Sequence, residues 1–104
     1  MSLPLWFHPD AETELNDAAD CYALQSPGLD QQFMAEIEQA LAQIVEFPEA
    51  AAPGRDRTRS KVLLGYPYSL MYSVNQSGIR VLAVAHHKRR PFYWHGRSWA
   101  HVWG

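Results

Sequence analysis

Residues 79–97 read IRVLAVAHHKRRPFYWHGR, and this stretch joins an apolar run to a basic and aromatic one. The run IRVLAVA at 79–85 is apolar and β-branched enough to predict a buried strand. Two histidines, one lysine and two arginines follow directly, and a proline and three aromatic residues come after them. A basic cluster at the end of a buried strand is a candidate for binding or catalysis.

Two apolar stretches precede this strand and predict a meander of three strands. They are KVLL at 61–64 and SLMYSV at 69–74, and YPY at 66–68 separates them. NQSG at 75–78 supplies a hairpin turn before the last strand. A further short strand is predicted for LWF at 5–7.

Two helices are predicted between the first strand and the meander. Acidic residues follow Pro9, where they complement the helix dipole. SPG at 26–28 breaks the first helix, and Pro48 ends the second. Each helix has one apolar face, because apolar residues recur at spacings of three and four. The apolar positions are Ala11, Leu15, Ala18, Ala19 and Tyr22 in the first helix, and Leu29, Phe33, Ile37, Ala40, Leu41 and Ile44 in the second.

The order of elements predicts one α+β domain over residues 1–104. It reads β-α-α-β-β-β, with an antiparallel helical hairpin packed on a small, mostly antiparallel sheet. A length of 104 residues fits a single domain with one modest core. No apolar run approaches the length of a membrane span, and no signal-peptide pattern is present. The only cysteine, Cys21, excludes a disulfide framework, so we expect a cytoplasmic protein and a packed or partly exposed thiol.

The net charge is −2, but the charges are divided between the two halves of the chain. All nine lysines and arginines lie in the second half, whereas ten of the eleven acidic residues lie in the first. Such asymmetry favours a positive surface for an anionic partner. The alternative is that the two halves neutralise each other within the fold.

Two segments supply the candidate positive surface. One is RDRTRSK at 55–61, whose basic residues alternate and would share one face of an extended segment. The other is HHKRRPFYWHGR at 86–97. Arginine and lysine bind phosphate oxygens, and tyrosine and tryptophan stack on unpaired bases. The expected RNA- or target-binding residues are Arg55, Arg57, Arg59, Lys61, Lys88, Arg89 and Arg97.

RNA cleavage by its own 2′-hydroxyl is the reaction that these residue types would support. It requires a base, cations that stabilise the phosphorane-like transition state, and an acid. His86 or His87 could be the base, because histidine titrates near neutrality. As adjacent strand residues they point to opposite faces and cannot bind one metal ion together, so no metal and no cofactor is expected.

The same residues also have structural interpretations. The aromatic residues at 92–94 could close the core beneath the helices instead of stacking on bases. Arg59 and Arg90 could pair with helix acids such as Asp17 or Asp20, although surface pairs of this type contribute little to stability.

Taken together, the pattern resembles the RelE/ParE superfamily of toxins from type II toxin–antitoxin systems. It is most similar to the ParE-like branch of plasmid stabilization proteins. The resemblance extends from about Phe7 to Arg97. Its pieces are FHPDAETELNDAADCYALQSPGLDQQF at 7–33, IVEFPEAA at 44–51, RSKVLLGYPYSLMYSV at 59–74 and VLAVAHHKRRPFYWHGR at 81–97.

The resemblance implies a helical hairpin on a small antiparallel sheet and a growth-inhibiting toxin that a cognate antitoxin neutralises. RelE-like members cleave mRNA on the ribosome, whereas ParE-like members inhibit DNA gyrase and lack the ribonuclease function. The ending HxxRxPxYW is typical of the ParE-like branch. A domain of the same fold that no longer poisons the cell is the third interpretation.

The family's functional positions are carried over residue by residue. Arg59 would correspond to an arginine on the sheet face, and the closing motif would correspond to His86, Arg89, Arg90, Tyr93 and Arg97. If the protein is a nuclease, the expected catalytic residues are His86, Arg90 and Tyr93.

Overall fold

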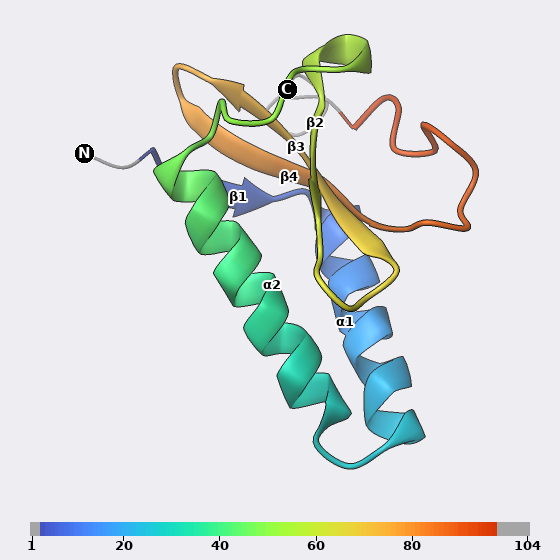
Figure 1. Ribbon diagram of the computed structural model, residues 1–104. Coiled ribbons are helices and arrows are strands. Elements are labelled where there is room, and N and C mark those ends of the chain that lie inside the picture. Colours follow the sequence, from blue (N-terminus) through green and yellow to red (C-terminus); the bar gives the residue numbers. More distant parts are fainter. Residues whose placement is uncertain (1–2, 98–104) are drawn as a thin grey trace.

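The computed structural model describes residues 3–97 and has the element order that the sequence predicts (Figure 1). No helix within these residues is long and apolar enough to cross a membrane. The elements are β1 (Leu5–Phe7), α1 (Pro9–Gln25), α2 (Leu29–Glu46), the 3-10 turn η1 (Arg55–Arg57), β2 (Arg59–Val62), β3 (Tyr68–Asn75) and β4 (Gly78–His86).

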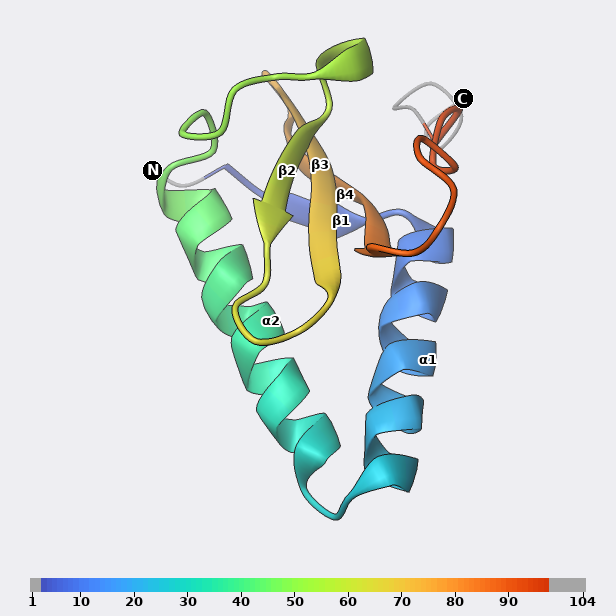
Figure 2. The same ribbon diagram turned by 45° about the vertical axis from the view of Figure 1, so that its right-hand side comes forward.

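The two helices form the predicted antiparallel hairpin and extend beyond the sheet (Figures 1 and 2). The break lies at the predicted SPG. The N–H of Ser26 donates to the carbonyl of Tyr22, and Gly28 has a left-handed φ of +84° that reverses the chain direction. Because the connection is short, the apolar stripes of both helices face the same side.

The sheet has the order β1-β4-β3-β2, so β4 and β3 are its inner strands. The pairs β2–β3 and β3–β4 are antiparallel, whereas β1 joins β4 in parallel. The β3–β4 register passes from Tyr72↔Val81 to Met71↔Ala83, so Leu82 is an extra residue on β4. This bulge shifts which backbone groups of β4 face the β1 side.

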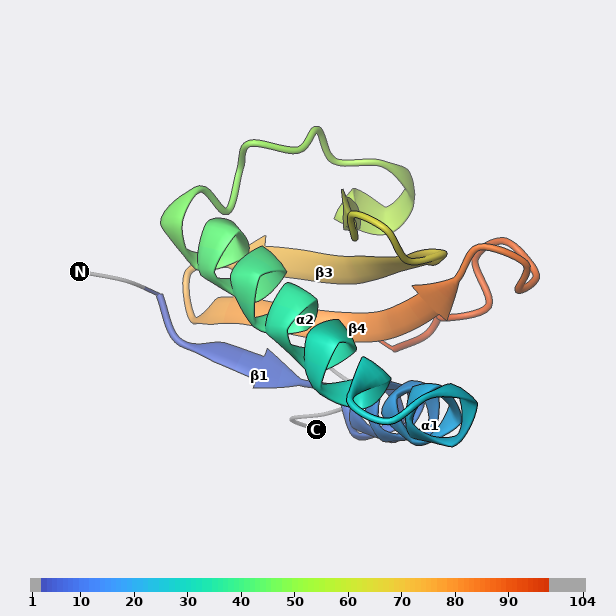
Figure 3. The same cartoon turned by 60° about the horizontal axis from the view of Figure 1, so that its bottom comes forward.

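The core lies between the helices and one face of the sheet; in Figure 3, α2 crosses in front of β3 and β4. Alternate residues of β3, such as Leu70 and Tyr72, point into this layer. Tyr72 also donates through its hydroxyl to the carbonyl of Pro48 at 3.2 Å, which ties the chain after α2 to the sheet. The buried helix residues are Ala11, Leu15, Ala18, Phe33, Ile37, Ala40 and Ile44.

Gly78 holds the β3–β4 turn against the first strand. Its φ is +146°, and a Cβ built there would lie 2.5 Å from the carbonyl oxygen of Pro4 and 2.8 Å from the ring of Trp6. The next residue, Ile79, donates its N–H to that same Pro4 carbonyl at 2.8 Å. Only glycine allows this close approach of β1 to the hairpin.

We therefore expect Gly78→Ala to be more destabilising than a substitution at a glycine with open surroundings. Gly65 is the matched control, because its φ is +81° but a Cβ there would meet nothing within 4 Å. Urea denaturation should give a loss of about 1 kcal/mol for Gly65→Ala and roughly 3 kcal/mol or more for Gly78→Ala. Equal losses for the two variants would contradict the close approach.

Candidate target-binding surface

Residues 87–97, called here the C-terminal segment, follow β4 as a series of turns without helix or strand. Figure 2 shows this segment running from the end of β4 toward the N-terminal part of α1. His87, its first residue, donates its N–H to the carbonyl of Pro67 at 2.9 Å. The backbone hydrogen bonds farther along are local, as in Arg89 N–H to the His86 carbonyl and His95 N–H to the Phe92 carbonyl. The position of the segment therefore depends largely on side-chain contacts with the rest of the fold.

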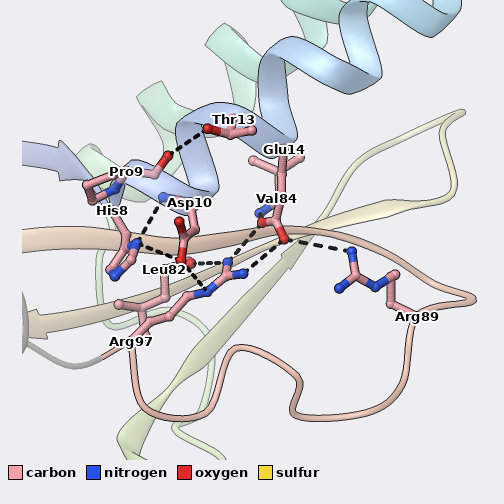
Figure 4. Close-up of polar contacts among 9 residues, drawn as sticks. All are labelled: His8, Pro9, Asp10, Thr13, Glu14, Leu82, Val84, Arg89 and Arg97. Carbon is pink, nitrogen blue, oxygen red and sulfur yellow. Dashed lines mark hydrogen bonds and ion pairs between the residues drawn. The ribbon is translucent and has the colours of Figure 1, made fainter.

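Arg97 attaches the far end of the C-terminal segment to α1 and β4 (Figure 4). Its guanidinium donates to both carboxylate oxygens of Glu14, at 3.0 Å and 3.2 Å, and to the carbonyl of Leu82 at 2.9 Å. The side chains of Arg97 and Glu14 are only 16% and 15% exposed. A two-pronged, charge-assisted pair in such a site is geometrically specific and stronger than an exposed ion pair.

This ion pair occupies the edge of β4 that β1 leaves open. Parallel pairing with β1 stops near Phe7, after which the N–H of His8 donates to the carbonyl of Val81. Beyond that point Arg97 donates to the Leu82 carbonyl, and Glu14 accepts the N–H of Val84 at 3.0 Å. Two side chains thus satisfy backbone groups for which no neighbouring strand is available.

Tyr93 lies beneath two arginines beside the same carboxylate. The Arg89 guanidinium is centred 3.9 Å from the Tyr93 ring and that of Arg97 5.2 Å from it. Burial, followed by the neighbouring Glu14 carboxylate, raises the pKa of the Tyr93 hydroxyl above its ordinary value. The surroundings of Tyr93 therefore favour the protonated hydroxyl.

The turn η1 meets the middle of the C-terminal segment. The guanidinium of Arg55 lies 4.6 Å from the centre of the Phe92 ring, and Asp56 Oδ2 lies 2.6 Å from His95 Nδ1. Asp56, Arg57 and Phe92 are the non-glycine residues with positive φ in the part of the chain that the structure describes. Because this backbone is disfavoured for such residues, the junction between the two segments is a locally strained site.

A pocket of about 490 Å³ opens at this junction. Its lining combines the apolar side chains of Leu82 and Trp94 with charged side chains from both segments. The lining residues are Asp56, Arg57, Thr58, Ser73, Leu82, Trp94, His95, Gly96 and Arg97.

The structure thus brings together the two segments in which the sequence placed the positive surface. We call the exposed cations of η1 and of residues 88–90 the basic surface. The Arg55–Phe92 contact joins its two parts. Its members are Arg55, Arg57, Lys88, Arg89 and Arg90.

The prediction that Arg55, Arg57, Arg59 and Lys61 share one face of an extended segment is wrong. Residues 55–57 form a 3-10 turn with left-handed residues inside it, and β2 begins only at Arg59. Arg59 bends back and donates to the carbonyls of Glu49 and Ala51, so it fastens the loop after α2. Lys61 is half-buried on β2 and lines a different pocket.

The expected catalytic residues do not share one pocket. His86 packs edge-on against Tyr68, with ring centres 5.0 Å apart, and its Nδ1 accepts the N–H of Lys88. The pocket of about 320 Å³ beside His86 includes Glu14 and Arg89 in its lining but neither Arg90 nor Tyr93. Arg90 is exposed on the surface.

His86 and His87 have different neighbours, although only His86 lies on β4 and His87 begins the turn that follows. Nε2 of His87 lies 2.9 Å from the Ser69 hydroxyl, whereas His86 packs on Tyr68. Within residues 3–97, no group of three or more His, Cys, Asp or Glu side chains could hold a metal ion. His101, a further histidine of the sequence, lies outside the described residues.

Glu14 is the site residue that sequence reasoning missed. The pairs considered between basic residues and helix acids involved Asp17 and Asp20, but both are exposed, and it is Glu14 that hydrogen-bonds Arg97 and lies near Arg89. A signal was present, since Glu14 lies three residues after Ala11 and four before Ala18 on the apolar face of α1. A carboxylate on the buried face of a helix needs a cation or a hydrogen-bond donor beside it, because burying an unpaired charge is unfavourable.

Comparison with known proteins agrees with this architecture. Residues 5–91 match the family of the ParE toxin of type II toxin-antitoxin system, parDE. Because the match spans most of the chain, the class of protein is that of the type II toxins, and the resemblance predicted from the sequence is confirmed. The chain belongs to the ParE toxin family.

No curated protein matches the sequence. Among solved structures, one similar chain comes from the "Chromosomal ParDE TA system from P. aeruginosa". It is 19% identical, with a TM-score of 0.70, over 81% of this chain and 95% of that chain. At this identity the likeness shows a shared fold.

Arg97 and Arg89 should differ in their effect on stability. Arg97→Ala leaves Glu14 and the Leu82 carbonyl without their cation, and should cost about 3 kcal/mol of unfolding free energy. Arg89 is 54% exposed and 4.0 Å from Glu14, so Arg89→Ala should cost less than about 1 kcal/mol. Chemical denaturation measures both, and equal costs would contradict the assignment of Arg97 as the attachment point.

His8 connects the start of α1 to the same group of charges. Its Nδ1 accepts the N–H of Asp10 at 3.0 Å and so caps the helix as a neutral imidazole. The Asp10 carboxylate lies 3.9 Å from this nitrogen and 3.8 Å from Nε of Arg97. Burial lowers the pKa of His8; Arg97 and Arg80 act in the same direction, and Asp10 and Glu14 oppose it.

A lowered pKa in the folded state means that the unfolded chain binds a proton more readily. The contribution of His8 to stability is therefore present above pH 6.5, its ordinary pKa, and is lost as the pH falls below that value. His8→Asn keeps a capping acceptor but does not titrate. Urea midpoints between pH 7.5 and 5 should fall more steeply for the wild type than for this variant, and parallel curves would refute the role of His8.

Proposed function

We propose that this chain is the toxin of a type II toxin–antitoxin pair, acting in the cytoplasm of a bacterial cell. It arrests growth by binding DNA gyrase through the basic surface, and it does so without cleaving mRNA. The observation that carries this proposal is a contrast between two sets of cations. Those of η1 and residues 88–90 are exposed, whereas Arg59 and Arg97 are held by the fold.

The arrangement of the candidate catalytic groups supports binding over cleavage. Nuclease chemistry needs a base, an acid and cations around one phosphate. His86 packs on Tyr68, whereas Tyr93 packs under Arg89, so the candidate base and the tyrosine contact different side chains. The guanidinium of Arg97 donates hydrogen bonds to Glu14 and to the Leu82 carbonyl, so it is not available to bind a phosphate.

A cognate antitoxin is the proposed second partner. The related structure described above is that of a ParDE system, and we extend this partnership to the present chain. The exposed cations favour an acidic antitoxin segment that covers them, since complementary charge speeds association and suppresses wrong partners. A segment that orders only on binding could cover both parts of the basic surface at once.

Two assays test the proposed function directly. Expression of the chain alone should stop growth, and co-expression of the neighbouring antitoxin reading frame should restore it. Purified protein should inhibit supercoiling of relaxed plasmid by gyrase and should leave mRNA on ribosomes intact. Arg90→Glu should weaken the inhibition by roughly tenfold, because it reverses one exposed charge of the interface.

Lys61→Glu is the matched control, since it reverses one charge outside the basic surface and should inhibit like the wild type. Cleavage of ribosome-bound mRNA that His86→Ala abolishes would replace the proposal with a ribonuclease mechanism. Normal growth of cells that express the chain, together with unaffected gyrase activity, would instead favour the interpretation that this domain is no longer toxic.

A further inference from the structure

We propose that Glu14, an acid in the negatively charged half of the chain, is the positioning residue for the basic surface. Its carboxylate holds the C-terminal segment in the conformation that binds the target. This inference rests on the proposed function for its biological meaning. Its physical content, the order of residues 87–97, stands independently of which target is bound.

The first support is the number of groups that converge on one carboxylate. Glu14 accepts the N–H of Val84 and both terminal nitrogens of Arg97, and Nη1 of Arg89 lies 4.0 Å away (Figure 4). The two arginines belong to opposite ends of the C-terminal segment. A single side chain on α1 therefore holds the far end of the segment relative to β4 through Arg97 and attracts Arg89 near its start.

The second support is the weakness of the alternatives. The segment has two other ion pairs within the described residues. His95–Asp56 is 62% and 58% exposed, and in Arg97–Asp10 the acid is 65% exposed and 3.8 Å from the guanidinium nitrogen. Exposed pairs contribute little, because water screens them and two side chains must be ordered. The Arg55–Phe92 contact also lies at the surface. Glu14 is 15% exposed, so its hydrogen bonds are the stronger restraint on this segment.

The third support is the placement of Arg89, a member of the basic surface. Arg89 stacks on Tyr93, and Tyr93 lies next to Glu14 and beneath Arg97. Loss of the Glu14 charge releases Arg97 and removes the attraction on Arg89. The Tyr93 ring, which packs against both arginines, then loses its fixed position. The cations then sample many positions, and binding the target requires ordering them first.

The test compares Glu14→Gln with Glu12→Gln, which removes one exposed charge from the same helix. Hydrogen exchange should become faster in residues 87–97 of Glu14→Gln and stay unchanged in β3 and α2. Glu12→Gln should exchange like the wild type. A uniform increase across the chain would indicate a merely structural role and would overturn the proposal.

Gyrase inhibition is the second readout. Glu14→Gln should need about tenfold more protein for half-inhibition, as expected for loss of a charge-assisted contact, while Glu12→Gln should not. Unchanged inhibition would overturn the positioning role. If the wild type itself does not inhibit gyrase, the proposed function fails, and the exchange pattern alone decides the inference. If Glu14→Gln does not fold, Arg97→Lys, which keeps the charge without the planar fork, should show the same local exchange.

Discussion

The structure depends on how the backbone N–H and C=O groups along the uncovered edge of β4 find hydrogen-bond partners. β4 is nine residues long, whereas β1 is three, so β1 covers only the first part of that edge. A helix acid and an arginine from the end of the described chain take the place of the missing neighbour through the Leu82 carbonyl and the Val84 N–H. The bulge at Leu82 belongs to the same arrangement, because it changes which groups of β4 face that side.

This constraint also explains the divided charges. The sequence allowed two interpretations, an exposed positive surface for a partner or neutralisation of one half by the other. The structure contains both, since Glu14 neutralises Arg97 at a largely buried position while the cations of η1 and residues 88–90 are exposed. Glu14 thus holds Arg97 within the fold and backbone carbonyls hold Arg59, while the cations of η1 and residues 88–90 stay available to a partner.

The fold was predictable because its signals are local. Apolar spacing marked the faces of both helices, and the turn residues at 26–28 and 75–78 marked the reversals. The contact between η1 and Phe92 was not predictable, since Arg57 and Phe92 both have left-handed backbone that such side chains rarely adopt. The Glu14–Arg97 pair joins positions 83 residues apart, and no local pattern specifies such a partner.

The central claim is that Glu14 and Arg97 interact strongly enough to hold the C-terminal segment. A double-mutant cycle with Glu14→Gln, Arg97→Gln and the double variant, followed by urea denaturation, measures their coupling free energy most directly. The account predicts a favourable coupling of about 2 kcal/mol, as expected for a two-pronged pair in a largely buried site. A coupling below about 0.3 kcal/mol, the range of independent sites, would contradict it.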